Sequence, residues 1–292
     1  MENVWLLLSL GAVVLYGIAQ VAQKVSLTHI PASVVVFLSI TIATPISLIC
    51  LSPFIWTGEI LDVGAVPFMI GLLSATFGQL GYYLYVEAAQ RGPISIVGSV
   101  TSAYPIMVVA VAIFFLSESP GPLQLAGALM VTSSVTVLSY IHGGKSKELH
   151  PSGQYFTLCI ASMLLYGLWG VFAKLALDEI PWLMYVGMYA FVIPPTVFVY
   201  VKRKGIKFRH AIPSWSVPFI IAIIAAEIGN IGFFFEVNAV ADGPASIVFP
   251  LVASSPVIVI LLAYGFLRER LTKVETLLVI AVILGIVLVS TV

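Results

Sequence analysis

The side chain best placed to do chemistry in this sequence is the carboxylate of Glu227, which lies in the middle of a long apolar run. A charge at the centre of a lipid bilayer costs about 2.5–3.5 kcal/mol. Burial favours the neutral form, so Glu227 could carry a proton or, when ionised, pair with a cationic group. A protonated side chain with a fixed hydrogen bond to a neighbouring helix is the structural alternative. Glu236 and Glu87 lie nearer the ends of their runs, and Glu236 is a reserve candidate.

Other polar side chains share the face and the depth of Glu227. Asn230 and Phe234 follow it at spacings of three and seven residues, which place all three on one side of a helix. The corresponding stripe in the first half of the chain comprises Thr76, Gln79 and Tyr83. Gln79 and Asn230 could contact a ligand, or they could hydrogen-bond one helix to another.

Aromatic side chains at the same depth suggest the walls of a binding site. An aromatic box attracts an alkylammonium group by cation–π interaction, although aromatic residues in membranes more often pack or anchor at the interface. Tyr16 and Tyr166 favour the binding-site interpretation because they occupy the same place in the two halves of the chain. The predicted substrate-binding residues are Tyr16, Gln79, Tyr82, Tyr83, Tyr104, Tyr166, Trp169, Glu227, Asn230 and Phe234.

Several other kinds of chemistry lack the residues that they need. The histidines all lie in predicted loops, so neither a metal cluster nor a histidine base is expected within the membrane. No lysine or arginine lies in the middle of a predicted span, which argues against anionic substrates. A glycine-rich phosphate loop is missing, so we expect no ATP drive and no cofactor. Cys50 and Cys159 lie apart without metal-binding spacing.

These side chains must be positioned by membrane-spanning helices. Of the 292 residues, 60% are hydrophobic and 9% are charged, which excludes an ordinary soluble protein. The 13 basic and 13 acidic residues give no electrostatic case for nucleic-acid binding, and the continuous apolar runs exclude a β-barrel. A helix needs about 20 apolar residues to cross the hydrocarbon core. Ten such runs are predicted, at residues 3–24, 31–52, 66–89, 93–116, 122–141, 154–175, 181–201, 216–239, 244–267 and 273–291.

The lysines and arginines indicate how these spans are oriented. In the ten-span arrangement Lys174 alone lies on one side, whereas Lys24, Arg91 and the remaining basic residues lie on the other. Because cytoplasmic loops are enriched in lysine and arginine, both termini are predicted to lie outside the cytoplasm. The cell membrane is the expected location.

The chain contains a long internal repeat. Leu15-Tyr16-Gly17 recurs as Leu165-Tyr166-Gly167 at an offset of 150 residues, and Gly92-Pro93 recurs as Gly243-Pro244 at an offset of 151. Five spans in each copy give the second copy the opposite orientation in the membrane. We therefore predict an all-α membrane protein of ten transmembrane helices, built as two inverted five-helix repeats at residues 1–150 and 151–292.

Four prolines lie inside predicted spans at corresponding places in the two halves. They are Pro45, Pro105, Pro195 and Pro256. Each removes one helix hydrogen bond and bends its helix. The bends could serve packing alone, but symmetric breaks favour curved helices around a central cavity, with these prolines as hinges.

The sequence resembles the EamA branch of the drug/metabolite transporter superfamily over nearly its whole length. The resemblance rests on the repeat, the paired prolines and the endings Phe115-Leu116-Ser117-Glu118 and Phe266-Leu267-Arg268-Glu269. The second ending is similar to the Gly-Glu-Arg-like turn of that family, whereas the first lacks the arginine. The resemblance implies a ten-helix secondary transporter, with spans one to four and six to nine around a cavity. It also implies transport of amino acids, amines, nucleosides or other metabolites.

We therefore expect a secondary active transporter of small amphiphilic metabolites, such as amino acids or organic amines. Alternating access about a mid-membrane cavity is the expected mechanism, with proton coupling at Glu227 and export as the expected mode. An uncoupled facilitative permease of the same fold is an alternative in which Glu227 is purely structural. An intramembrane enzyme is disfavoured, because the polar belt offers a single strong acid. The expected partners are a small-molecule substrate, the lipid bilayer and protons, while the oligomeric state stays open.

Overall fold

The computed structural model describes residues 4–92, 94–144, 153–205, 216–267 and 272–289, and all regular elements in these ranges are helical. The first half contains α1 (Val4–Leu27), α2 (Ala32–Leu38), the π-helical turn η1 (Ser39–Ala43), α3 (Thr44–Thr57), α4 (Glu59–Asp62), α5 (Ala65–Arg91), α6 (Ile94–Thr101), α7 (Pro105–Phe115) and α8 (Pro122–Gly144). The second half contains α9 (Gly153–Leu177), α10 (Trp182–Arg203), α11 (Val217–Asp242), α12 (Ala245–Val252), α13 (Ser255–Leu267) and α14 (Lys273–Val289). The prediction of an all-helical protein is confirmed.

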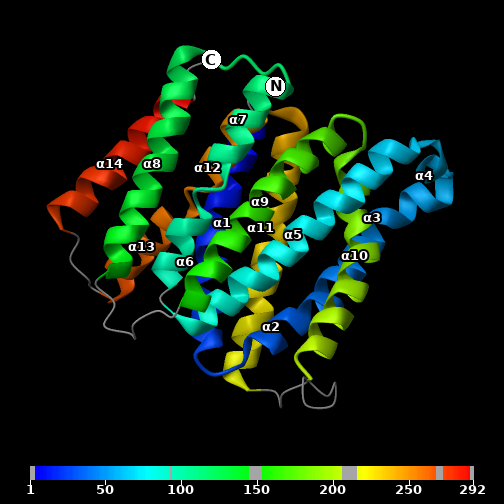
Figure 1. The fold of residues 1–292 in the computed structure, drawn as a ribbon, viewed down its shortest axis with the longest axis horizontal. Coiled ribbons are helices and arrows are strands. Elements are labelled where there is room, and N and C mark those ends of the chain that lie inside the picture. The colour runs from blue at the N-terminus through cyan, green and yellow to red at the C-terminus, as the bar shows by residue number, and fades with distance from the viewer. Residues whose placement is uncertain (1–3, 93, 145–152, 206–215, 268–271, 290–292) are drawn as a thin grey trace.

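Several of these helices are suited to a membrane by length and composition. Six described segments are long and apolar enough to cross one: Val4–Leu27, Ala32–Thr57, Ala65–Arg91, Gln154–Leu177, Trp182–Arg203 and Val217–Asp242. Shorter apolar helices are Pro105–Phe115, Pro122–Leu138 and Ala245–Val259. The long helices form a bundle, and the two ends of the chain lie at the same edge of it (Figure 1). The chain is therefore an integral membrane protein.

Two of the predicted spans are interrupted helices. The span predicted at residues 93–116 is divided into α6 and α7, and the one at 244–267 is divided into α12 and α13. Pro105 is the first residue of α7 and Pro256 is the second residue of α13. Because proline has no backbone N–H, neither residue can continue the hydrogen-bond ladder of the helix before it. Breaks at equivalent places in two halves are typical of transporter binding sites.

The other two predicted hinge prolines have different surroundings. Pro45 is the second residue of α3, which directly follows the irregular turn η1. Pro195 lies beside Pro194 within α10, which runs from Trp182 to Arg203 without interruption. The helix breaks therefore belong to Pro105 and Pro256, while a hinge motion at any of the four prolines stays a prediction.

The two halves are joined by helix pairs that cross from one to the other. α1 packs along α11, and α5 packs along α9 (Figure 1). A Cβ atom on Gly81 would lie 3.3 Å from the ring of Tyr166, and one on Gly232 would lie 3.2 Å from the ring of Tyr16. Each tyrosine thus packs on a glycine of the other half, and these glycines match each other in the sequence repeat.

α8 and α14 form a separate pair at the side of the bundle (Figure 1). Their backbones meet at two glycines: a Cβ atom on Gly127 would lie 2.6 Å from the carbonyl oxygen of Gly285, and one on Gly285 would lie 2.9 Å from that of Gly127. Small residues allow helices in a membrane to approach closely enough for extensive van der Waals contact. This contact holds the last helix of one half against the last helix of the other.

Glu118 connects the two halves through the start of α12. The chain leaves α7 through Ser117, whose φ of 56° lies in the left-handed region. The Glu118 carboxylate accepts hydrogen bonds from the backbone N–H groups of Ala245 and Ser246 at 2.9 Å each, and from Ser246 Oγ at 2.6 Å. A carboxylate at this position accepts hydrogen bonds from the free N–H groups, and its negative charge interacts favourably with the positive end of the helix dipole. In the first copy, the glutamate of the Phe-Leu-x-Glu ending thus caps a helix of the other half; its second copy, at Glu269, lies outside the described residues.

We expect Glu118→Ala to destabilise the protein by about 1–3 kcal/mol, because two backbone donors and a buried serine lose their acceptor. The matched control is Glu59→Ala, since Glu59 is exposed in the first turn of α4. Thermal unfolding of the purified proteins in detergent measures the difference. Equal unfolding temperatures for both variants would contradict the capping role.

Candidate substrate-binding cavity

A cavity of about 310 Å³ lies between the two halves of the chain. Its walls come from α1, span two (α2, η1 and α3), α5 and the α6–α7 break, and from the corresponding elements of the second half. Both helix breaks contribute, through Ser102 and Tyr104 in one half and Ala253 and Ser255 in the other. Its volume lies at the lower end of the roughly 300–1,000 Å³ typical of small-molecule pockets. The cavity therefore suits a small metabolite.

Most of the predicted binding residues line this cavity. Those that do are Tyr16, Gln79, Tyr82, Tyr104, Tyr166, Trp169, Asn230 and Phe234. Tyr83 does not, because its hydroxyl pairs with Thr196 Oγ1 of α10 at 3.1 Å. Glu227 does not line it either, although it lies at the middle of α11 as expected. Binding by any of these residues stays a prediction, and Tyr83 and Glu227 are not among the residues that line the cavity.

The acid that lines the cavity is Glu236, which the sequence offered only as a reserve candidate. At about 100° per residue, Glu227 lies about 120° around the helix from Phe233, a lining residue in the middle of the inward face. Glu236 lies within about 60° of Phe233 by the same count. Its depth along the helix favoured Glu227 as the acidic group of the binding site, whereas the direction of the side chain around the helix favours Glu236.

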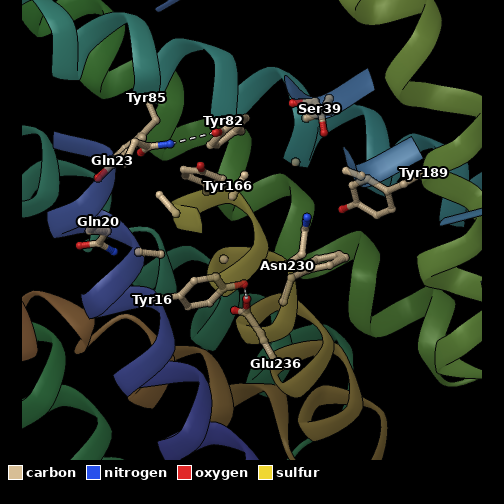
Figure 2. Close-up of a pocket in the computed structure, with 18 of the residues that line it drawn as sticks. Tyr16, Gln20, Gln23, Ser39, Tyr82, Tyr85, Tyr166, Tyr189, Asn230 and Glu236 are labelled. Carbon is tan, nitrogen blue, oxygen red and sulfur yellow. Dashed lines mark hydrogen bonds between the residues drawn. The ribbon is translucent and has the colours of Figure 1, made fainter. Parts of the chain in front are cut away.

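Glu236 is held in place by a tyrosine from the other half. Its carboxylate accepts a hydrogen bond from the Tyr16 hydroxyl at 2.6 Å, and only 3% of the residue is exposed (Figure 2). Tyr104 also interacts electrostatically with it. Within the described part of the chain, no lysine, arginine or histidine forms an ion pair with Glu236. A buried acid without a cationic partner is unusual, since buried charges are normally paired.

Aromatic rings enclose the space beside Glu236. The rings of Tyr104 and Tyr166 are 6.0 Å apart between centroids, and the Trp169 indole lies 6.3 Å from Tyr166 and 6.4 Å from Phe233. Trp169 is fixed because its Nε1 donates a hydrogen bond to Tyr185 Oη at 3.1 Å. An organic cation binds favourably over such ring faces.

Amide side chains line the rest of the cavity wall. Gln20 Nε2 donates to Ser255 Oγ at 3.0 Å. Gln23 Nε2 donates to Tyr82 Oη at 2.9 Å (Figure 2). Gln79 and Asn230 reach the cavity from α5 and α11. Gln20 and Gln23 were missed in the sequence, although their spacing from Tyr16 by four and seven residues places all three on one face of α1.

The two halves of the cavity differ in charge. Glu236 corresponds to Tyr85 at the repeat offset of 151, and Tyr85 also lines the cavity. No lysine, arginine or histidine is among the described lining residues. The cavity therefore offers a single acidic group, and its electrostatics favour a cationic or neutral ligand.

Comparison with known proteins agrees with this architecture. The model of the EamA-like transporter family matches residues 3–140 and, a second time, residues 154–291. The chain belongs to the EamA-like transporter family. It is thus a membrane transporter of the drug/metabolite transporter superfamily, with a small-molecule substrate and the lipid bilayer as partners, and the two matched segments fall on the two halves of the bundle. Members of the family are transporters rather than enzymes, in keeping with the expectation that this chain is not an enzyme.

Two further similarities concern single proteins. This EamA-like chain is 30% identical over 127 residues to the uncharacterized protein MJ1333.1 of Methanocaldococcus jannaschii, covering 44% of this chain and 89% of the relative. That relative is about as long as one of the two halves. A solved structure, described as a crystal structure of a protein, superposes with a TM-score of 0.74 at 17% identity, covering 99% of this chain and 97% of the other. This likeness supports the fold of the EamA-like transporter along its entire length.

Proposed function

We propose that this protein is a secondary active transporter of small amphiphilic metabolites that carry an amino group, such as amino acids or organic amines. The observation that carries the proposal is Glu236, a buried carboxylate without a cationic partner among the described residues, in a cavity walled by aromatic rings. A substrate ammonium group could take the place of the missing partner, and its apolar part could lie against Tyr104, Tyr166 and Trp169.

The proposed mechanism is alternating access between inverted repeats. In this proposal the helical segments make ten membrane crossings, five in residues 1–150 and five in 151–292, which form two domains. Rocking of one half against the other would open the cavity to each side in turn. The breaks at Pro105 and Pro256 lie at the cavity wall and support this motion, because an interrupted helix bends more easily than a continuous one.

Proton coupling is proposed at Glu236 rather than at Glu227. A proton and a cationic substrate would compete for the one carboxylate of the cavity, so that each releases the other. This competition couples the two fluxes without a second acid. Export from the cytoplasm is the proposed mode. We also propose that both termini lie on the outer side of the cell membrane, which the lysines and arginines of the loops support.

Transport by purified protein in liposomes tests this function. We expect radiolabelled amines or amino acids to accumulate above equilibrium when a proton gradient of opposite direction is imposed, and a protonophore to abolish the accumulation. Uptake that only equilibrates would replace the proposal with an uncoupled facilitative permease. Absence of uptake for amines, amino acids and nucleosides alike would contradict the proposed substrate class.

A further inference from the structure

A cluster of charged side chains connects α5 of the first half with α10 of the second half at one end of the cavity. Glu87 on α5 forms an ion pair with Lys204 Nζ at 2.9 Å and accepts a hydrogen bond from the Tyr200 hydroxyl. Arg91, one turn further along α5, also pairs with Glu87. The Lys204 ammonium lies 5.7 Å from the centroid of the Tyr200 ring. We call these four residues the latch.

The latch carboxylate is shielded from solvent. The side chain of Glu87 is 8% exposed, against 37% for Arg91 and 39% for Lys204. Removing one partner from a shielded ion pair costs more than removing it from an exposed one, because the remaining charge stays poorly solvated. The contacts between Glu87 and α10 therefore stabilise this arrangement of the two halves.

The repeat provides an internal comparison for the latch. At the repeat offsets, Glu87 and Arg91 correspond to Asn238 and Asp242 on α11. Tyr200 and Lys204 correspond to Cys50 and Phe54 on α3. None of these four counterparts can form the same ion pair, since the set contains no basic residue. Among the described residues, no ion pair connects α11 with α3 at the opposite end of the cavity.

The helix packing is also tighter at the end of the cavity that carries the latch than at the opposite end. α5 and α10 are joined along their length, by Ser74 and Tyr185 at 2.8 Å, by the bond between Tyr83 and Thr196, and by the latch. Their counterparts are α11 and span two. α11 contacts α2 and η1 but makes almost no contact with α3. Figure 1 shows α3 at the edge of the bundle, apart from α11. α5 and α10 are thus bonded to each other at the latch end, whereas the equivalent pair, α11 and α3, makes almost no contact.

We infer that the latch locks the transporter in the state that is closed at the Glu87 end, and that it must break before α3 can dock on α11. This inference rests on the proposed alternating-access function and deepens it by naming what regulates access to the site. Since the described residues form such an ion-pair cluster at the Glu87 end alone, the two end states are unequal in the absence of substrate. The protein therefore rests with the cavity open between α3 and α11.

Distance measurements between spin labels at Thr57 and Asp242 test the inference. Both positions are exposed, at the ends of α3 and α11, and the background carries Cys50→Ser and Cys159→Ala. We expect one long distance in this background. In Glu87→Gln and in Lys204→Met a shorter distance should appear, with the ratio of the two states shifted roughly tenfold or more, because a hydrogen-bonded charge pair is lost.

Asp178→Asn is the matched control, since it removes the ion pair between Lys174 and Asp178 at the end of α9, and both of these residues belong to the second half. An unchanged distance distribution in both latch variants would overturn the inference, and so would an equal shift in the control. If Glu87→Gln loses its fold, Lys204→Met decides the outcome, because Lys204 is the more exposed partner and Glu87 keeps its ion pair with Arg91. The distance measurement needs no substrate, so it can contradict the inference about the latch without contradicting the proposed transport function. The liposome assay tests the transport function separately.

Discussion

Glu236→Gln should weaken the binding of a cationic amine by roughly 30-fold or more and abolish proton-driven accumulation. The amide has nearly the shape of the carboxylate and can still contact the Tyr16 hydroxyl, but it carries no charge to balance an ammonium group. Loss of one partner from a desolvated charge pair costs about 2–5 kcal/mol, and every 1.4 kcal/mol is a factor of ten in affinity. Ligand-induced thermal stabilisation and liposome uptake measure the two effects.

The matched control for this prediction is Glu227→Gln, which makes the same chemical change on the same helix. Glu227 lies on α11 outside the cavity, so we expect binding and uptake close to those of the unaltered protein. The reverse result, with normal function in Glu236→Gln and loss in Glu227→Gln, would return the central role to Glu227. Loss in neither variant would remove the carboxylates from the mechanism and leave recognition to the aromatic rings.

Gly127→Leu should cause the largest loss of stability among substitutions of single glycines. A Cβ atom at this position would lie 2.6 Å from the carbonyl oxygen of Gly285 and 2.9 Å from the backbone nitrogen of Val289. Backbone atoms cannot move aside as a flexible side chain can, so α8 and α14 would have to separate. Overpacking of this kind costs about 1–3 kcal/mol or more, and the lost helix contact adds to it. Thermal unfolding in detergent measures the change.

Gly98→Leu is the control for Gly127→Leu, because a Cβ atom on Gly98, also within a helix, would meet nothing within 4 Å. We expect its unfolding temperature to stay close to that of the unaltered protein. Similar losses in both variants would mean that general helix effects, rather than the contact between α8 and α14, set the stability at Gly127.

The sequence predicted the features that depend on the order of residues along the chain. The internal repeat at offsets of 150 and 151 anticipated the twofold match to the family, and the Gly-Pro pairs anticipated the starts of α6 and α12. Hydropathy located the helices. It did not reveal the breaks after Thr101 and Val252, because both sides of each break are equally apolar.

The choice between Glu227 and Glu236 depended on the direction of the side chains, which hydropathy does not report. A usable signal was nevertheless present. Gly232 matches Gly81 in the repeat, and a glycine retained in both halves suggests a close contact across the bundle. Glu236 follows Gly232 by four residues and therefore lies on the same face of α11, toward Tyr16. The helix face that carries the matched glycine would therefore have favoured Glu236 over Glu227.

The cap on α12 also bears on how the chain is made. The ribosome adds Glu118 to the chain 127 residues before Ala245, whose N–H donates a hydrogen bond to it. It adds Tyr16 220 residues before Glu236, to which the Tyr16 hydroxyl donates. α1 and α5 likewise enter the membrane before α11 and α9, against which they pack. Until the second half is synthesised, the helices of the first half lie in the membrane without the helices that pack against them. Contacts between residues so far apart in the sequence therefore form late in folding. A chain cut short after α8 would keep these faces exposed to lipid, because the helices that cover them belong to the second half.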